Sequence, residues 1–149
     1  MKSLYTPEAE QEILARIEKL TPENQRQWGK MEADQMLAHC TAALETATGE
    51  KNPPRLFIGK ILGALVKKRT LGDTPFPKNS PTDKSFIIAD RRDFDAEKQK
   101  LVQIIKRYVA AGENNCTKQP HSFFGKMTPA EWGTLMYKHL DHHLKQFSA

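Results

Sequence analysis

The pattern of hydrophobic and polar residues divides the chain into four helical segments joined by polar connections. In each segment apolar residues recur every three or four positions, which is the spacing of one face of an α-helix. No stretch alternates apolar and polar residues as a half-buried strand would. The pattern therefore predicts an all-α fold, with helices over residues 7–20, 33–48, 95–111 and 129–147.

Residues typical of helix ends support these bounds. Gly49 and Gly112 are placed to end the second and third helices, because glycine readily adopts the left-handed conformation that ends many helices. The fourth helix has the clearest start. Thr128-Pro129-Ala130-Glu131 combines a capping box with a proline at the first helical position.

A long connection, residues 50–94, separates the second and third helices. It contains the basic amphipathic stretch RLFIGKILGALVKK and the proline-rich stretch LGDTPFPKNSPTD. Such a helix can associate with a membrane surface, but we expect it to fold over the other helices. The sequence thus predicts one domain over residues 1–149, a four-helix bundle with a long helical crossover between helices two and three. The crossover is expected to line the entrance of any pocket in the bundle.

Composition narrows the functional classes. The 149 residues carry a net charge of +5, but the basic residues are spread out and form no nucleic-acid-binding motif. The two cysteines, Cys40 and Cys116, are far apart, which suits a reducing compartment. There is no apolar leader and no run of about 20 apolar residues. We therefore expect a cytoplasmic protein that has no nucleic-acid or membrane partner and acts on a small molecule.

Three of the five histidines lie in the segment HLDHHLKQF, residues 139–147. His139 and His143 are four residues apart, so they share the apolar face of the last helix, whereas His142 is turned about 100° away from His143. Two inward imidazoles are hard to pair with helix backbone, and a metal ion can accept a lone pair from each neutral ring. The spacing is one that zinc sites use. On the same helix, Asp141 is expected to be a solvated charge.

A third ligand is available on the second helix. His39 flanks the apolar face of that helix, beside the small Ala42 and Ala43. One alternative is an ordinary buried histidine with a hydrogen bond across the bundle. We favour convergence of His39 with His139 and His143, which would leave coordination positions open, as catalytic sites do.

These residues also carry a resemblance. The segments GKMEADQMLAHC and HSFFGKMTPAEWGTLMYKHLDHHLKQF resemble the DinB-like superfamily of metal-binding four-helix bundles, and more closely a small branch known mainly as a domain of unknown function. The resemblance covers nearly the whole chain and implies that His39, His139 and His143 hold a divalent metal. It departs at Glu32, where many relatives have Ser or Thr, which weakens a helix cap. Homodimers occur in the superfamily, so a homodimer is one expected assembly.

The resemblance leaves the reaction open, because members of the superfamily differ in activity. The first hypothesis is a divalent-metal-dependent enzyme, either a transferase that uses a low-molecular-weight thiol or a hydrolase, with Zn, Ni, Fe or Mn as the metal. The second is a non-catalytic or stress-related metal-binding module. His121 is a weaker candidate for an acid/base group at the mouth of the site, although a loop histidine bonded to nearby backbone is the more frequent case. Gln146 lies near the histidine face and is a candidate to orient a ligand.

Overall fold

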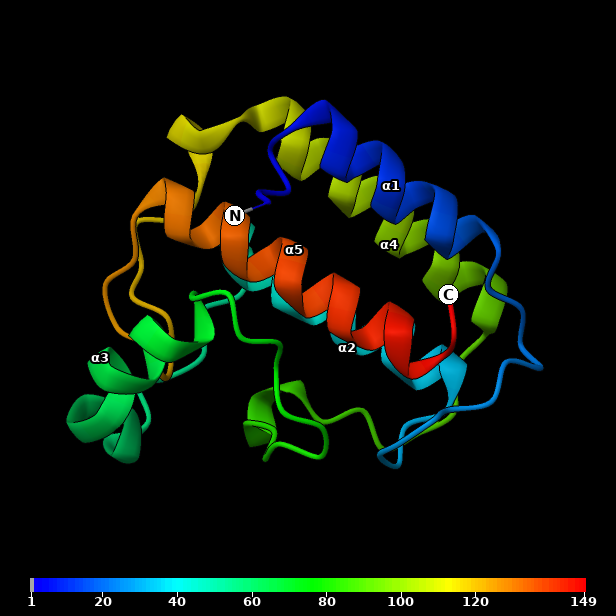
Figure 1. The fold of residues 1–149 in the computed structure, drawn as a ribbon, viewed down its shortest axis with the longest axis horizontal. Coiled ribbons are helices and arrows are strands. Elements are labelled where there is room, and N and C mark those ends of the chain that lie inside the picture. Colours follow the sequence, from blue (N-terminus) through cyan, green and yellow to red (C-terminus); the bar gives the residue numbers. More distant parts are fainter. Residues whose placement is uncertain (1) are drawn as a thin grey trace.

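The computed structural model describes residues 2–149, and within this range it is all-helical, without strands. Figure 1 shows the arrangement of its helices. The five α-helices and two short 3-10 helices have the following bounds: α1 Pro7–Glu18, α2 Ala33–Thr48, α3 Phe57–Thr70, η1 Lys84–Phe86, α4 Phe94–Ala111, η2 Glu113–Asn115 and α5 Pro129–Gln146.

The helix starts follow the capping residues. The hydroxyl of Thr128 accepts a hydrogen bond from the backbone N–H of Glu131, and the Glu131 carboxylate accepts one from the N–H of Thr128. This reciprocal pair is the capping box expected from the sequence. At the start of α2, the Glu32 backbone N–H donates to the side-chain oxygen of Gln35 at 2.9 Å. Gln35 thus makes the capping-box bond to the N–H of the N-cap residue, whereas a serine or threonine at position 32 would accept the N–H of residue 35.

Four helices enclose one hydrophobic core. Helix α2 packs against α4 and α5, and α1 packs against the same two helices from the other side (Figure 1). The inward stripes expected from the periodicity are buried, including Ile13, Leu37, Ile105, Trp132 and Leu140. These helices give α2 and α5 a fixed relative position, and the histidines lie between them.

The crossover between α2 and α4 is tied to the N-terminal turn of α2. The carboxylate of the buried Asp34 accepts two hydrogen bonds from Arg91 Nε, at 3.1 and 3.0 Å, and one from the Arg92 N–H at 2.6 Å. One residue along α2, the Gln35 side chain donates to the carbonyl of Ala89 at 3.0 Å. These bonds fix the end of the crossover against α2, close to His39.

Helix α3 lies apart from the other helices in Figure 1, and it is attached through a glycine face. Gly59 and Gly63 lie against the backbone of Phe123, so closely that an added Cβ would come within 2.5 and 2.2 Å of its carbonyl oxygen. We expected this amphipathic helix to fold over the other helices. That expectation was wrong, because α3 docks by its glycine face on the turn at Phe123 and its large apolar residues remain exposed. No helix in residues 2–149 has both the length and the apolar content needed to cross a membrane.

Candidate metal centre

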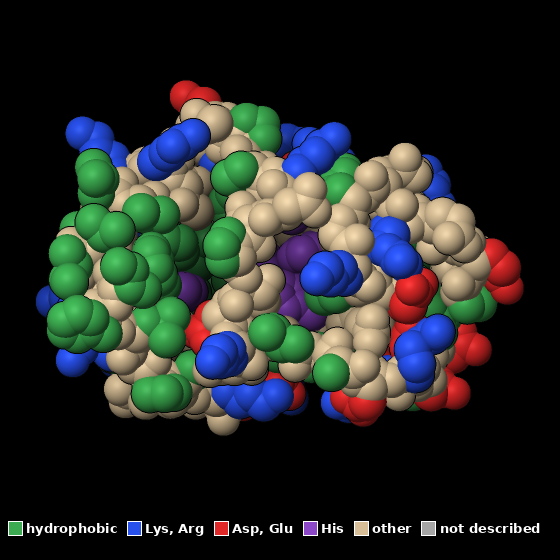
Figure 2. Space-filling model, turned by 90° about the horizontal axis from the view of Figure 1, so that it is seen from below, with side chains coloured by type: hydrophobic (Ala, Val, Ile, Leu, Met, Phe, Trp, Pro, Cys, Tyr) green, Lys and Arg blue, Asp and Glu red, His purple; other side chains and the backbone are tan. Residues whose placement is uncertain are grey.

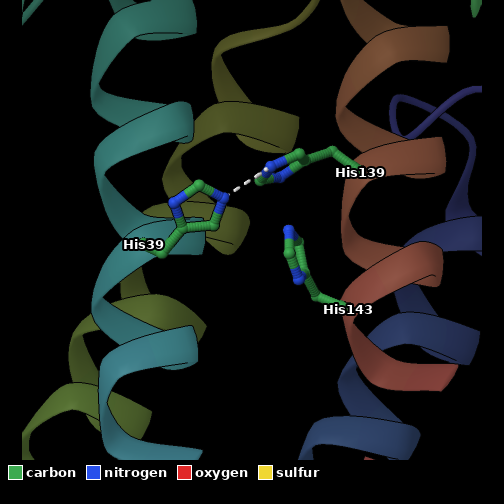
Figure 3. A group of neighbouring side chains, drawn as sticks. All are labelled: His39, His139 and His143. Atoms are coloured by element: carbon green, nitrogen blue, oxygen red, sulfur yellow. Dashed lines mark hydrogen bonds between the residues drawn. The ribbon is translucent and has the colours of Figure 1, made fainter. Parts of the chain in front are cut away.

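Three histidines from two helices point toward a common centre (Figure 3). His39 lies in the middle of α2, and His139 and His143 lie one turn apart on α5. One nitrogen from each ring lies within 4.8 Å of those of the other two. His39 and His143 are buried, and His139 is partly exposed. The structure therefore brings together the three residues that the sequence singled out.

The tightest approach is between His39 and His139. Their Nε2 atoms are 3.0 Å apart. Two histidine nitrogens bound to one zinc ion, each at ~2.0–2.1 Å, are about 2.8–3.4 Å apart for bond angles between octahedral and tetrahedral. The pair thus has the separation of two ligands on one ion. Without an ion, the same distance requires a proton between the two nitrogens.

The tautomer of His39 is set by a backbone carbonyl from the crossover. His39 Nδ1 lies 2.9 Å from the carbonyl oxygen of Phe86, at the end of η1. A carbonyl oxygen can only accept, so Nδ1 carries the proton and donates it. In the neutral ring Nε2 is then unprotonated, and its lone pair faces His139 and His143. Metal-binding histidines are commonly oriented by such a bond at the other ring nitrogen.

His143 is oriented in the same way by a side chain. Its Nδ1 lies 2.8 Å from the Oε1 of Gln146, and the Nε2 of Gln146 donates to the Trp28 carbonyl at 2.7 Å. The second bond fixes the amide so that its oxygen faces His143, which leaves Nδ1 as the donor and Nε2 with a free lone pair. This contact confirms the position expected for Gln146.

Gly29 makes room for this Gln146 contact. Its φ is +79°, and an added Cβ would lie 2.6 Å from the Gln146 Nε2. A side chain at this position would therefore be strained in its backbone and would displace the amide that orients His143. The connection between α1 and α2 is thus part of the site's support.

The environment keeps the three rings neutral. Burial lowers the pKa of His39, and burial together with the neighbouring charges of His143 and His39 holds the pKa of His139 well below its usual value. Burial, with the charge of His39, lowers the pKa of His143 to about 3. A neutral histidine is the form that binds a metal ion. Near pH 7 the cluster therefore offers three lone pairs and no protonated ring.

The other two histidines lie outside this group. His142 is half-buried and its ring lies 5.4 Å from that of Trp28 and 5.8 Å from that of Phe76, so it packs among aromatic residues of the connections. His121 Nδ1 accepts the backbone N–H groups of Phe123 and Phe124, at 3.1 and 3.2 Å. Burial lowers the pKa of His121 to about 4. His121 thus shapes the turn that supports α3, which matches the second alternative given above for this residue.

The expectation for Asp141 changes. Asp141 is not a simple solvated charge, because Arg16 and Lys145 each approach its carboxylate to 2.8 Å. Arg16 connects α1 to α5, and this explains why Asp141 is only partly exposed. Cys40 is fully packed beside Met36, and burial raises the pKa of its thiol, so it is a core residue.

Sequence reasoning missed the groups that contribute only backbone atoms. The Phe86 and Trp28 carbonyls orient the site, but every residue has a carbonyl, so no side-chain pattern marks them. The proline-rich crossover was expected near the pocket, and its end at η1 does reach His39. Only the three-dimensional path of the chain identifies which carbonyl makes the contact.

Comparison with known proteins identifies the family and no further relative. No curated protein and no solved structure matches the chain. The model of one family, described as "Protein of unknown function (DUF1569)", matches residues 2–149. This match spans all five α-helices and all three histidines of the cluster. The chain therefore belongs to the DUF1569 family.

Proposed function

We propose that His39, His139 and His143 hold one divalent metal ion in a DinB-like four-helix bundle. The observation that carries this proposal is the set of three converging nitrogens, two of them with tautomers fixed by Phe86 and Gln146. Buried neutral imidazoles that face one another are unfavourable unless something accepts their lone pairs. Zn, Ni, Fe and Mn all accept imidazole ligands, and the donor set alone does not choose among them.

We infer further that the site is catalytic. The group has three protein donors, whereas structural zinc sites are usually closed by four. A divalent ion held here would supply a Lewis acid that lowers the pKa of a thiol or a water molecule at its open positions. This supports a metal-dependent transferase that uses a low-molecular-weight thiol, with a metal-dependent hydrolase as the second form of the same chemistry.

The surroundings suggest how a small substrate would reach the site. Histidine side chains are visible on the face shown in Figure 2, beside lysine or arginine side chains. Lys78 of the crossover lies 4.5 Å above the Trp28 ring, which in turn lies beside His142. Lys78 is therefore the best placed cation to attract an anionic group. Arg55 and Lys60 are less suited, since Arg55 binds the His121 carbonyl and Lys60 lies on α3.

A non-catalytic metal-binding module is the alternative. It would use the same three histidines but would have the remaining positions closed by protein atoms. Among residues 2–149, the cluster of histidine, cysteine and carboxylate donors has three members and no fourth. This favours the open site and hence the enzyme.

The metal assignment can be tested by elemental analysis of purified variants. We expect His39→Ala, His139→Ala and His143→Ala each to abolish stoichiometric metal, since each removes one of only three ligands. The matched control is His142→Ala, which removes a neighbouring imidazole from the same helix and should leave metal content unchanged. Retention of full metal after His139→Ala or His143→Ala, or its loss only after His142→Ala, would contradict the assignment.

The catalytic assignment needs a separate experiment. The cobalt-loaded protein should change its visible spectrum when a small thiol is added, because an open position admits the sulfur. A panel of thiols and electrophiles, with and without chelator, should then show turnover that disappears with the metal. A spectrum unchanged by every thiol and by small anions would indicate a closed site and favour the non-catalytic module.

A further inference from the structure

The outer face of α3 is an exposed apolar surface with no counterpart on the other helices. Five large apolar side chains of this helix are 41–76% exposed: Phe57, Ile58, Ile61, Leu62 and Leu65. At about 100° per residue they fall within one arc, opposite the glycine face that docks on Phe123. Figure 2 shows a continuous hydrophobic area at one end of the molecule, the end at which α3 lies in Figure 1. We name these five residues the α3 patch.

Contacts on the other sides of α3 fix this orientation. The Leu56 N–H donates to the Ser122 carbonyl at 3.0 Å, at the start of the helix. At its end, Lys67 forms an ion pair with Glu131 at 2.9 Å, and Lys138 donates to the Thr70 carbonyl at 2.6 Å. The helix cannot turn its α3 patch inward without breaking these bonds and separating the glycine face from Phe123. The α3 patch is therefore held on the outside of the fold by these contacts.

The charged residues of α3 and of the segment that leads into it are all basic. Residues 51–72 contain no acidic residue and six basic ones, namely Lys51, Arg55, Lys60, Lys67, Lys68 and Arg69. Lys68 and Arg69 are exposed and lie in the last turn of α3, within the arc of the patch, and Lys60 is exposed at its border. A surface that is apolar in the middle and cationic at its edge is complementary to anionic headgroups above an acyl layer.

We propose that α3 lies in the interface of an anionic lipid membrane. Its apolar residues would enter the headgroup–acyl boundary, and Lys60, Lys68 and Arg69 would bind lipid phosphates, as long cationic side chains do at such depths. This association does not require the helix to span the bilayer, which is consistent with the lack of a membrane-spanning helix in residues 2–149. It replaces the expectation of no membrane partner, which depended on α3 covering the bundle.

A second copy of the chain fits this surface less well. A two-fold interface uses the same patch on both copies, so α3 would face α3 and two surfaces of the same positive charge would meet. The helix has 14 residues, so it is about 21 Å long and about 10 Å across. Such a face is smaller than the ~800 Å² per partner of a standard stable interface. A lipid surface sets no such minimum and supplies the opposite charge.

The test is flotation of the full-length protein with vesicles of phosphatidylglycerol and phosphatidylcholine, compared with phosphatidylcholine alone. We expect binding to the anionic vesicles and weak binding to the neutral ones. The double variant Ile61→Glu/Leu65→Glu should lose binding, while the control Ile87→Glu, which changes an exposed isoleucine outside α3, should keep it. Circular dichroism checks that both variants remain helical.

A second pair of variants tests the charge. Lys68→Glu/Arg69→Glu should lower the partition coefficient by at least about twentyfold, since one basic residue near an anionic surface contributes roughly fivefold. The control Lys19→Glu/Lys106→Glu makes the same change in net charge on exposed residues elsewhere. Equal effects of the two pairs, no vesicle binding by the parent protein, or binding that survives Ile61→Glu/Leu65→Glu would overturn the proposal. So would light scattering that shows a dimer which this last variant converts to a monomer.

Discussion

Helices α3 and α5 both have apolar residues at helical spacing in the sequence, yet the apolar face of α5 is buried and that of α3 is exposed. On α5 the stripe that contains Trp132 and Leu140 is buried, and His139 and His143 are carried into the site with it. On α3 the glycine face docks and the stripe that contains Ile61 and Leu65 remains exposed. Periodicity thus identifies a helix and its apolar face. Which face docks, however, depends on the surface that the neighbouring segment presents to the helix.

The neighbour of α3 explains the difference. The turn at residues 121–125 presents backbone rather than side-chain grooves, and a helix can approach backbone closely only where it lacks side chains. Gly59 and Gly63, four residues apart, provide such a surface. Helix α5 packs against α1 and α2, and the apolar residues of all three helices belong to one buried core. The same pattern therefore yields a core in one place and an outward surface in the other.

The largest effect that separates the two helices is on stability. Leu140→Ala on α5 should lower the free energy of unfolding by about 2–5 kcal/mol, because it leaves a cavity at a fully buried position. The matched change Leu65→Ala on α3 should alter it by less than about 0.5 kcal/mol, because that side chain is 73% exposed. Urea unfolding followed by circular dichroism measures both. Equal losses would mean that the α3 patch is covered.

A smaller effect is expected on metal affinity when the contact that orients His143 of α5 is disturbed. Gly29→Ala should weaken metal binding by roughly 10–100-fold, because it displaces the Gln146 amide that orients His143. Gly112→Ala is the control: its φ is +74°, so it carries similar backbone strain, but no atom lies within 4 Å of its added Cβ. Competition with a chromophoric chelator measures both affinities. If the two variants lose affinity equally, the Gln146 contact does not support the site.

Local signals in the sequence were sufficient for the helices. The starts and ends at Thr128, Gly49 and Gly112 lie where capping chemistry put them, and the all-helical expectation is confirmed. Helix angles placed His139 and His143 on one buried face, and their convergence with His39 was the favoured alternative, which the resemblance also implied. That these residues bind metal, and what reaction follows, stays a prediction.

Contacts between distant segments could not be read from the sequence. The Phe86 carbonyl reaches His39 because the bond between Asp34 and Arg91 holds the crossover against α2. Nothing in the sequence of a basic chain marks these two residues as a pair. The prediction for the orientation of α3 was wrong for the same reason. Its docking surface is backbone at Phe123, 60 residues beyond Gly63, and backbone leaves no compositional signal.

The third effect is the pH dependence of stability that one α5 histidine contributes. In the metal-free protein His143 has a pKa of about 3, whereas an unfolded histidine titrates near 6.5. Between these values the unfolded chain binds a proton that the folded chain does not, so stability falls as pH falls below about 6.5. One such histidine contributes about 1.4 kcal/mol per pH unit across that window.

Urea unfolding between pH 6.5 and 5, in the presence of chelator, should therefore show a steeper pH dependence for the parent protein than for His143→Gln. The control Lys68→Ala changes an exposed residue of α3, far from the histidines in the sequence, and should leave the slope unchanged. Added metal should steepen the loss of stability on acidification, because only neutral rings bind the ion and only the folded chain brings them together. A metal-free protein with the same slope before and after His143→Gln would mean that this ring is hydrated rather than buried, and the comparison between the α5 and α3 faces would then fail at the site itself.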